Sequence, residues 1–142
     1  MISFEEFEDI VMEIADSFPE DFFRELNGGV MVRRRRRLHP AAEERDLFIL
    51  GEYHIDRYLG RFVVLYYGSF ESCFGFCREE ELRNRIRKVL LHEFRHHLES
   101  LAGEHDLEIE DAVEISQYKY RKQIQKDLTE TSSGDRIDEV SF

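Results

Sequence analysis

The residues of this sequence best suited to chemistry are His92, Glu93 and His96. Two histidines four positions apart on a helix project from the same side and can share one metal ion. The glutamate after the first histidine can reach a water on that metal without being a ligand itself. Neutral imidazole is a common zinc ligand, and a carboxylate can pass the water's proton to a leaving amine. The H-E-x-x-H spacing therefore predicts one Zn²⁺ ion held by His92 and His96, with Glu93 as general base.

The position of these residues on the helix supports a site of this kind. At about 100° per residue, His96 lies at about 40° from His92, Val89 at about 60° and Glu93 at about 100°. The ionisable side chains thus continue an apolar stripe, where they are costly unless a metal ion pairs them. The alternative is a solvated, charged helix with an accidental His–Glu spacing, and we favour the metal site. For His97, a packed core histidine is favoured over a role beside the substrate.

A third ligand is expected, because two ligands hold zinc poorly. The candidates are Glu104, His105, Asp106, Glu108, Glu110 and Asp111. If the helix continues to Gly103, that residue lies about 10 Å along the axis beyond His96, and three residues span at most about 10–11 Å. Asp106 could then barely return to the metal, whereas Asp111 has eight residues for the return. We therefore favour Asp111 and keep Asp106 as the alternative, which takes over if the helix ends near Ser100.

The surrounding sequence predicts the elements that position these residues. Ser3 and Glu6 form a capping box before an apolar helical pattern that runs to Phe18, and Gly103 interrupts a later helical pattern. In chain order we expect a helix from Ser3, a short helix at about 20–26, a strand from 30, strands at 46–54 and 61–70 joined as a hairpin by 55–60, a helix of about 25 residues from 78, and a last helix at about 107–128. This order predicts an α+β domain over residues 1–128, with residues 129–142 as a loose tail.

Composition limits the classes of protein to which the chain can belong. Its 142 residues suit one domain, and a formal net charge of −11 argues against nucleic acid or an anionic membrane as the main partner. No apolar run is long enough to span a bilayer, and the acidic, amphipathic start is unlike a secretory signal, so we expect a cytoplasmic protein. The five arginines at 33–37 could bind acidic peptides or nucleic acid, but a solvated strand end is favoured. The oligomeric state is not indicated.

Several motifs resemble the small bacterial zincin-like metallopeptidase family, also called minimal zincins. These motifs are Leu91-His92-Glu93-Phe94-Arg95-His96-His97-Leu98, Asn27-Gly28-Gly29, Leu38-His39-Pro40, Leu50-Gly51-Glu52-Tyr53-His54 and Tyr66-Tyr67-Gly68-Ser69-Phe70. The resemblance extends over about residues 1–120, and its specific part is the H-E-x-x-H-H core. It implies a zincin-like α+β fold with a small antiparallel sheet beside the active-site helix. It also implies zinc on His92 and His96, an acidic third ligand, and Glu93 as general base.

Three functional hypotheses follow. The first is a zinc-dependent metallopeptidase that hydrolyses peptides or unfolded protein segments, which the strand at 62–67 would hold by main-chain pairing if it lies at the sheet edge. The second is a catalytically silent metal-binding or protein-interaction module on a zincin scaffold. The third is an acidic helical protein without a metal. Turnover separates the first two, and metal content separates the third from both.

Overall fold

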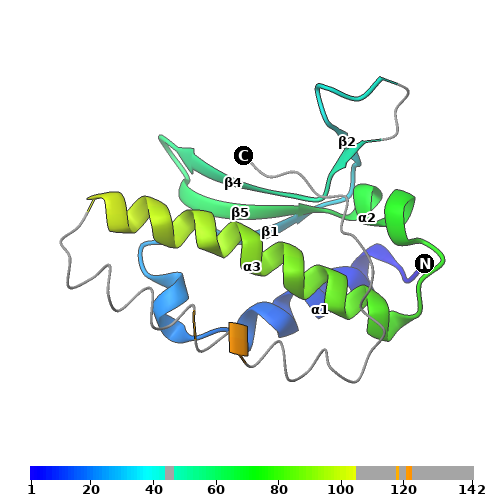
Figure 1. Ribbon diagram of the computed structural model, residues 1–142, viewed down its shortest axis with the longest axis horizontal. Helices are drawn as coiled ribbons and strands as arrows, with labels where there is room; N and C mark the ends of the chain where they lie inside the picture. The colour runs from blue at the N-terminus through cyan, green and yellow to red at the C-terminus, as the bar shows by residue number, and fades with distance from the viewer. Residues whose placement is uncertain (44–46, 105–117, 119–120, 123–142) are drawn as a thin grey trace.

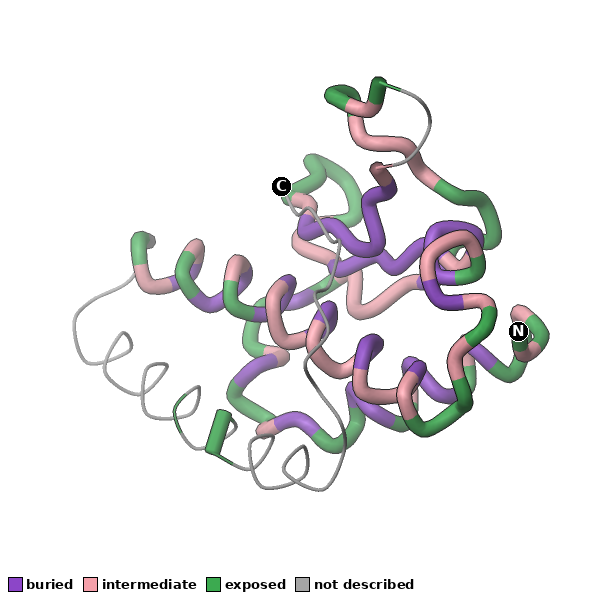
Figure 2. Tube along the Cα trace, turned by 45° about the vertical axis from the view of Figure 1, so that its right-hand side comes forward, coloured by how far each residue is buried: buried purple, intermediate pink, exposed green. Residues whose placement is uncertain are grey.

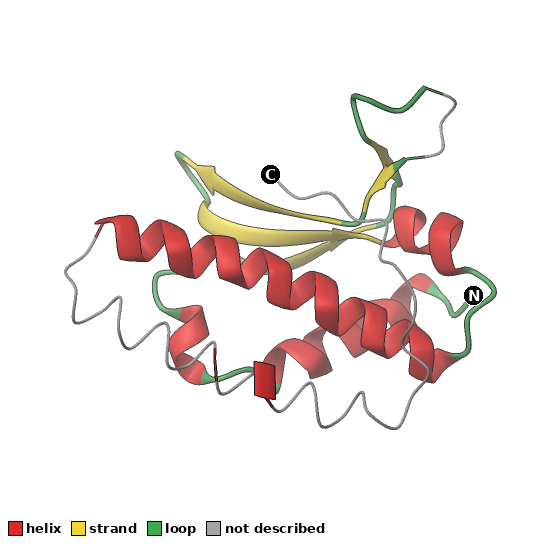
Figure 3. Ribbon diagram, in the orientation of Figure 1, coloured by secondary structure: helices red, strands yellow, loops and turns green. Residues whose placement is uncertain are grey.

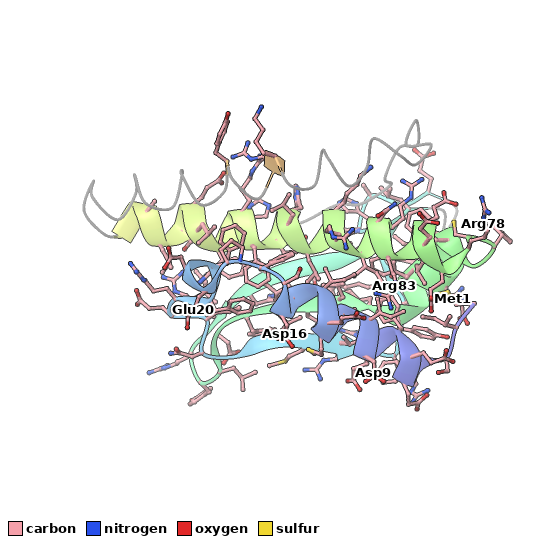
Figure 4. All side chains as sticks on the ribbon, turned by 90° about the horizontal axis from the view of Figure 1, so that it is seen from below. Met1, Asp9, Asp16, Glu20, Arg78 and Arg83 are labelled. Atoms are coloured by element: carbon pink, nitrogen blue, oxygen red, sulfur yellow. The ribbon has the colours of Figure 1, made fainter. Side chains whose placement is uncertain are left out.

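The computed structural model describes residues 1–43, 47–104, 118 and 121–122, and the statements below concern these residues. One long helix, α3 (Glu79–Glu104), and the N-terminal helix lie side by side on the same face of a small sheet (Figures 1 and 4). Two of the predicted elements, the helix at 107–128 and the tail at 129–142, lie almost entirely outside the described residues. Within the described part, no helix is long and apolar enough to cross a membrane.

The N-terminal helix α1 (Phe4–Asp16) begins at the predicted capping box. The Ser3 side chain accepts a hydrogen bond from the Glu6 backbone N–H, and the Glu6 side chain accepts one from the Ser3 N–H. The apolar face of α1 is buried, and a 3-10 helix, η1 (Glu20–Phe23), follows where a short helix was expected. α1 lies against α3, and Arg83 of α3 donates a hydrogen bond to the Glu13 carboxylate (Figure 4). This contact joins the C-terminal half of α1 to the start of α3 and helps to fix the two helices against each other.

The central sheet contains β1 (Gly29–Arg33), β4 (Gly51–Asp56) and β5 (Gly60–Tyr66) in the order β1-β5-β4. β4 and β5 form the predicted antiparallel hairpin, but β1 pairs with β5 in parallel, so the sheet is mixed rather than antiparallel. No tight turn links β1 to β5, and their relative direction is therefore not set by a hairpin. Because β5 is the central strand, the hypothesis that the strand at 62–67 lies at the edge is wrong. β4 is the edge strand beside α3.

Two further details differ from the sequence-based expectation. The strand expected at 46–54 is divided at Leu50 into β3 (Phe48–Ile49), which pairs with β2 (Arg37–Leu38), and β4. The strand expected at 61–70 ends at Tyr66, where a helix, α2 (Tyr67–Phe74), begins. The cause is tertiary: the Gly68 N–H donates to the carbonyl of Arg34, and the Ser69 hydroxyl accepts from the Arg37 N–H. These contacts stabilise a helical turn against the segment 34–37. They join residues distant in the sequence, so local sequence preference does not predict them.

α3 supplies the centre of the core, as the long helix expected from residue 78. Its buried apolar side chains are Leu82, Ile86, Val89, Leu90, Phe94, Leu98 and Leu101. One side of α3 contacts β4 and β5, and another side contacts α1 and η1 (Figures 2 and 3). On the second side, Phe94 packs against Phe18, Phe22 and Phe23. An α+β domain is thus confirmed, with the predicted site helix at its centre.

The approach of α3 to β4 depends on Gly51. A Cβ atom at this position would lie 2.8 Å from Cγ1 of Val89 and 3.4 Å from Cγ of Glu93. Separations under about 3.0 Å force something to move, and Val89 is a stiff, fully buried core residue. The missing side chain therefore sets the distance between the edge strand and the helix.

We expect Gly51→Ala to lower the free energy of unfolding by about 1–3 kcal/mol, because overpacking displaces Val89 or the strand. Urea denaturation measures this. Gly103→Ala is the matched control, since a Cβ there meets nothing within 4 Å and alanine favours a helix. Equal effects of the two substitutions would show that the close approach at Gly51 is unimportant.

Candidate metal centre

His92 and His96 lie on one side of α3, at the margin of its buried face. Both are half-buried, whereas Val89 and Glu93, the neighbouring positions on that side, are buried against β4. Phe94 lies on the opposite side of the helix and contacts the N-terminal aromatic residues. The two imidazoles are therefore placed beside the β4 edge of the sheet, where solvent or a ligand has access.

The two imidazoles approach each other closely, with Nε2 of His92 3.3 Å from Nε2 of His96. Two nitrogen ligands at about 2.0–2.1 Å from one tetrahedral zinc ion are separated by about 3.3–3.4 Å. The rings meet edge to face at an interplanar angle of 81°, so they do not stack. This pair has the separation that zinc requires, and the donor set is one that zinc prefers. The two residues present thus fit half of a zinc coordination sphere.

The pKa of His92 is lowered from its ordinary value of 6.5, chiefly because burial penalises the charged imidazole. The nearby positive charges of His96 and Arg95 lower it further, while Glu99 raises it. A histidine must be neutral to bind a metal, so this environment favours the state that a ligand needs. The protein thus reduces the competition between a proton and a metal at this nitrogen.

Glu93 lies one residue after His92 and is only 1% exposed. Its Cγ lies close to Gly51, at the contact between α3 and the edge strand β4. Glu93 is therefore a buried carboxylate next to His92 in the sequence, at the contact between α3 and β4. The bare backbone of Gly51 provides the room for it.

His97 is fully buried and belongs to a separate network. Its Nε2 lies 2.7 Å from the carbonyl of Arg24, and its Nδ1 lies 2.8 Å from the Tyr53 hydroxyl. A carbonyl only accepts, so Nε2 carries the hydrogen; in the neutral ring Nδ1 then accepts from Tyr53. Burial lowers the pKa of His97, and the positive charge of Arg61 lowers it further, whereas the bond to Arg24 raises it. The favoured interpretation of a packed core histidine is confirmed.

The network continues through Arg61, which sequence reasoning missed. Arg61 Nη1 donates to the Tyr53 hydroxyl at 2.8 Å and to the Ser100 hydroxyl at 2.6 Å. It therefore connects β5, β4 and the end of α3 one turn beyond His96. Alternation along β4 places Tyr53 on the same face as Gly51, but no sequence signal indicates its partners on other elements.

The third ligand lies outside the described residues under either alternative. α3 continues to Glu104, which is the condition under which Asp111 is preferred over Asp106. Between residues 1 and 104, without 44–46, no group of three or more His, Cys, Asp or Glu side chains is arranged to hold a metal ion. The structure thus places the two imidazoles 3.3 Å apart at Nε2, with Glu93 buried one residue after His92. The roles of His92, Glu93, His96, Asp106 and Asp111 at a metal stay predictions.

Comparison with known proteins identifies the family. A family model described as zincin-like metallopeptidase matches residues 41–115, which is over half of the chain and includes β4, β5 and α3. The chain belongs to the zincin-like metallopeptidase family. A solved structure, a conserved hypothetical protein from Thermus thermophilus, is 36% identical and covers 72% of this chain and 100% of its own, with a TM-score of 0.63. No curated protein matches the chain.

Membership of the zincin-like family agrees with the mixed α+β architecture and with the position of the histidine pair on α3. The matched region also contains residues 105–111, in which the predicted third ligands lie. The N-terminal residues 1–26 precede the match, yet they contribute Phe18, Phe22 and the Arg24 carbonyl to the contacts of α3. The fold of this zincin-like protein therefore depends on residues inside the matched region and on residues that precede it.

Tyr53→Phe is expected to lower the free energy of unfolding by about 1–3 kcal/mol, because it leaves the buried Nδ1 of His97 without its donor. Thermal or urea unfolding measures the change. Tyr58→Phe removes the same hydroxyl from a residue that is 90% exposed, and should change stability by less than about 0.5 kcal/mol. A neutral Tyr53→Phe substitution would mean that the network does not hold α3 to the sheet.

Proposed function

We propose that this protein is a zinc-dependent metallopeptidase that hydrolyses peptide bonds in peptides or unfolded protein segments. The observation that carries the proposal is the 3.3 Å separation of the His92 and His96 Nε2 atoms, beside a buried Glu93. Zincin-like family membership supports the same chemistry. The half-buried position of the histidines leaves the pair accessible from the β4 side.

In this proposal each residue of the site has one task. His92 and His96 bind Zn²⁺ through Nε2, with Asp111 or Asp106 as the third ligand. Zinc, when bound, lowers the pKa of a coordinated water towards about 7 and polarises the substrate carbonyl. Glu93 would hold the proton released by a water at the site and give it to the nitrogen of the departing amine. The burial of Glu93 beneath Gly51 keeps its carboxylate near the site and excludes solvent from one side of it.

The open edge of β4 supports an extended peptide as substrate. The Tyr66 N–H donates to the Leu50 carbonyl, so even-numbered β4 residues direct their backbone groups towards β5. Gly51, Tyr53 and Ile55 then direct their N–H and C=O groups away from β5, and no other strand of the described part pairs with this edge. A peptide pairing with these groups would run alongside α3, next to the histidine pair.

The alternative, a silent metal-binding or interaction module, uses the same residues for zinc but requires no turnover. The position of Glu93 favours the enzyme. Glu93 occupies the position of the general base in the H-E-x-x-H pattern, which a module that only binds zinc does not require.

Purified protein without a histidine tag is expected to bind about one zinc ion per chain. His92→Ala or His96→Ala should remove most of the affinity, because each leaves too few ligands. Zinc titration and metal analysis measure this, and His54→Ala, which removes a histidine on the other face of the sheet, is the control. Affinity should also fall as the pH drops below about 6, since protons then compete for the imidazoles. Unchanged metal content in both alanine variants would exclude the site.

Glu93→Gln should retain zinc and the fold but lose hydrolysis, because an amide cannot accept the water's proton. A peptide-cleavage assay with zinc analysis of the same samples separates the two effects. Wild-type turnover in the glutamine variant would disprove the role of Glu93. A wild-type protein that binds zinc but cleaves no peptide in a diverse library would favour the silent module.

Asp111→Ala is expected to weaken zinc binding more than Asp106→Ala. The continuation of α3 to Glu104 carries the chain away from the histidines, so only the longer return brings a carboxylate back easily. Asp106 would then cap the last helix, and its loss should cost about 1 kcal/mol of stability without affecting the metal. Zinc titration of both variants tests this, and equal affinities would mean that neither residue is the third ligand.

A further inference from the structure

The inner face of β4 ends in an exposed apolar residue. Side chains alternate along a strand, so Gly51, Tyr53 and Ile55 share the face that is directed towards α3. Gly51 and Tyr53 are buried, whereas Ile55 is 63% exposed. The cover that α3 gives to this face therefore ends between Tyr53 and Ile55.

A bridge formed by Arg61 marks the end of this cover. The turn between β4 and β5 lies at the same end of the molecule as the C-terminal end of α3 (Figure 1). Arg61, opposite Ile55 on β5, donates from Nη1 to the hydroxyls of Tyr53 and Ser100. This bridge closes the space between the sheet and α3 beside Tyr53, and Ile55 lies outside it.

The turn after Ile55 is fixed by its own hydrogen bonds. The Asp56 carboxylate accepts from the N–H groups of Leu59 and Tyr58, at 2.8 and 2.7 Å. These two bonds lower the pKa of Asp56 from its ordinary value, so the acceptor stays ionised. Gly60 completes the turn with a φ of 77°, which glycine adopts easily. The end of β4 is therefore held in one conformation, and little entropy is lost when a partner binds to it.

The edge of β4 is suited to receive a further strand. The N–H and C=O groups of Gly51, Tyr53 and Ile55 point away from β5. Edge strands that avoid pairing usually carry charged side chains or proline, and these three positions carry neither. A peptide that pairs here places one residue opposite Ile55 on the same face, with the two Cβ atoms about 4.5–5.5 Å apart.

Ile55 lies about three residues of extended chain from the level of the histidine pair. β4 and α3 run side by side in the same direction (Figure 1). Tyr53 contacts His97, which lies about 4.5 Å along the helix beyond the midpoint of His92 and His96. Ile55 lies about 6.6 Å beyond Tyr53 along the strand. The two distances together, about 11 Å, correspond to about three residues of an extended peptide.

The direction of the peptide decides on which side of the cleaved bond this residue lies. Antiparallel strands pair slightly more strongly than parallel strands, so a peptide antiparallel to β4 is favoured. Its N-terminal part then lies at Ile55 and its C-terminal part at Gly51. The residue opposite Ile55 is therefore the third before the bond that lies at the level of the histidine pair.

We propose that Ile55 is a specificity-determining residue, which selects peptides with a large apolar side chain at the third position before the cleaved bond. This role of Ile55 rests on the metallopeptidase function proposed above. An apolar pair across two strands is favoured over an apolar–polar pair, because both side chains leave water. Large apolar side chains are mostly buried in folded proteins, so this preference directs the enzyme to peptides and unfolded segments.

Cleavage of a positional peptide library by the zinc-loaded protein measures the preference. Phenylalanine or leucine should raise kcat/KM about two- to fivefold over serine at the third position before the cleaved bond. Ile55→Thr, which keeps a β-branched residue, should remove this preference, and Ile55→Lys should shift it towards glutamate. Tyr58→Ser is the matched control, because it removes a 90% exposed apolar side chain from the turn, outside the strand, and should retain the preference. An unchanged preference in Ile55→Thr, or a preference that lies after the cleaved bond, would overturn the proposal.

Peptide binding without cleavage separates the role of Ile55 from the proposed function. Fluorescence anisotropy measures how the zinc-loaded Glu93→Gln variant binds dye-labelled hexapeptides of alanine that begin with phenylalanine or with serine. The phenylalanine peptide should bind about two- to fivefold more tightly, and Ile55→Thr in the same variant should equalise the two. This result, with a wild-type protein that cleaves nothing, would refute the peptidase and retain the Ile55 contact. Absence of the preference, whether or not peptides are cleaved, would refute the role of Ile55.

Discussion

The contact between the bare backbone of Gly51 and the side of α3 is the constraint on which the rest of the structure depends. It fixes the distance between the edge strand and the helix that carries the histidine pair. β4 and α3 run side by side from this point. Gly51 lies beside Val89 and Glu93. Tyr53, two residues after Gly51, contacts His97, which lies four residues after Glu93. Two strand residues and four helix residues cover nearly the same length, about 6–7 Å, so the elements stay in register.

Three connections maintain this register beyond Gly51. The buried imidazole of His97 links β4 to the segment after η1, Arg61 links both hairpin strands to Ser100, and the N-terminal aromatic residues pack against Phe94 from the opposite side. Because α3 is held on both sides, His92 and His96 can be left half-exposed without losing their relative position. A pair of imidazoles fixed at a metal-binding separation before the metal arrives loses little entropy when it binds.

Local sequence patterns predicted those parts of the structure that local physics determines. The capping box at Ser3, the hairpin of β4 and β5, and the extent of α3 each follow from a few neighbouring residues, and so does the i, i+4 spacing of the histidines. The parallel pairing of β1, the end of β5 at Tyr66 and the hydrogen-bond partners of His97 depend on residues distant in sequence. The hypothesis of a substrate strand at 62–67 failed for this reason: hydrophobicity marked the strand but not its central place in the sheet.

The central claim is that Nε2 of His92 and of His96 bind the same zinc ion in the zincin-like site. Zinc K-edge X-ray absorption on stoichiometrically loaded, untagged protein tests it most directly, because the scattering reports the ligand types and their distances. We expect two imidazole nitrogens and at least one oxygen at about 2.0–2.1 Å, in four-coordinate geometry. Zinc coordinated by the sulfurs of Cys73 and Cys77 at about 2.3 Å, or by oxygen alone without imidazole scattering, would contradict this account.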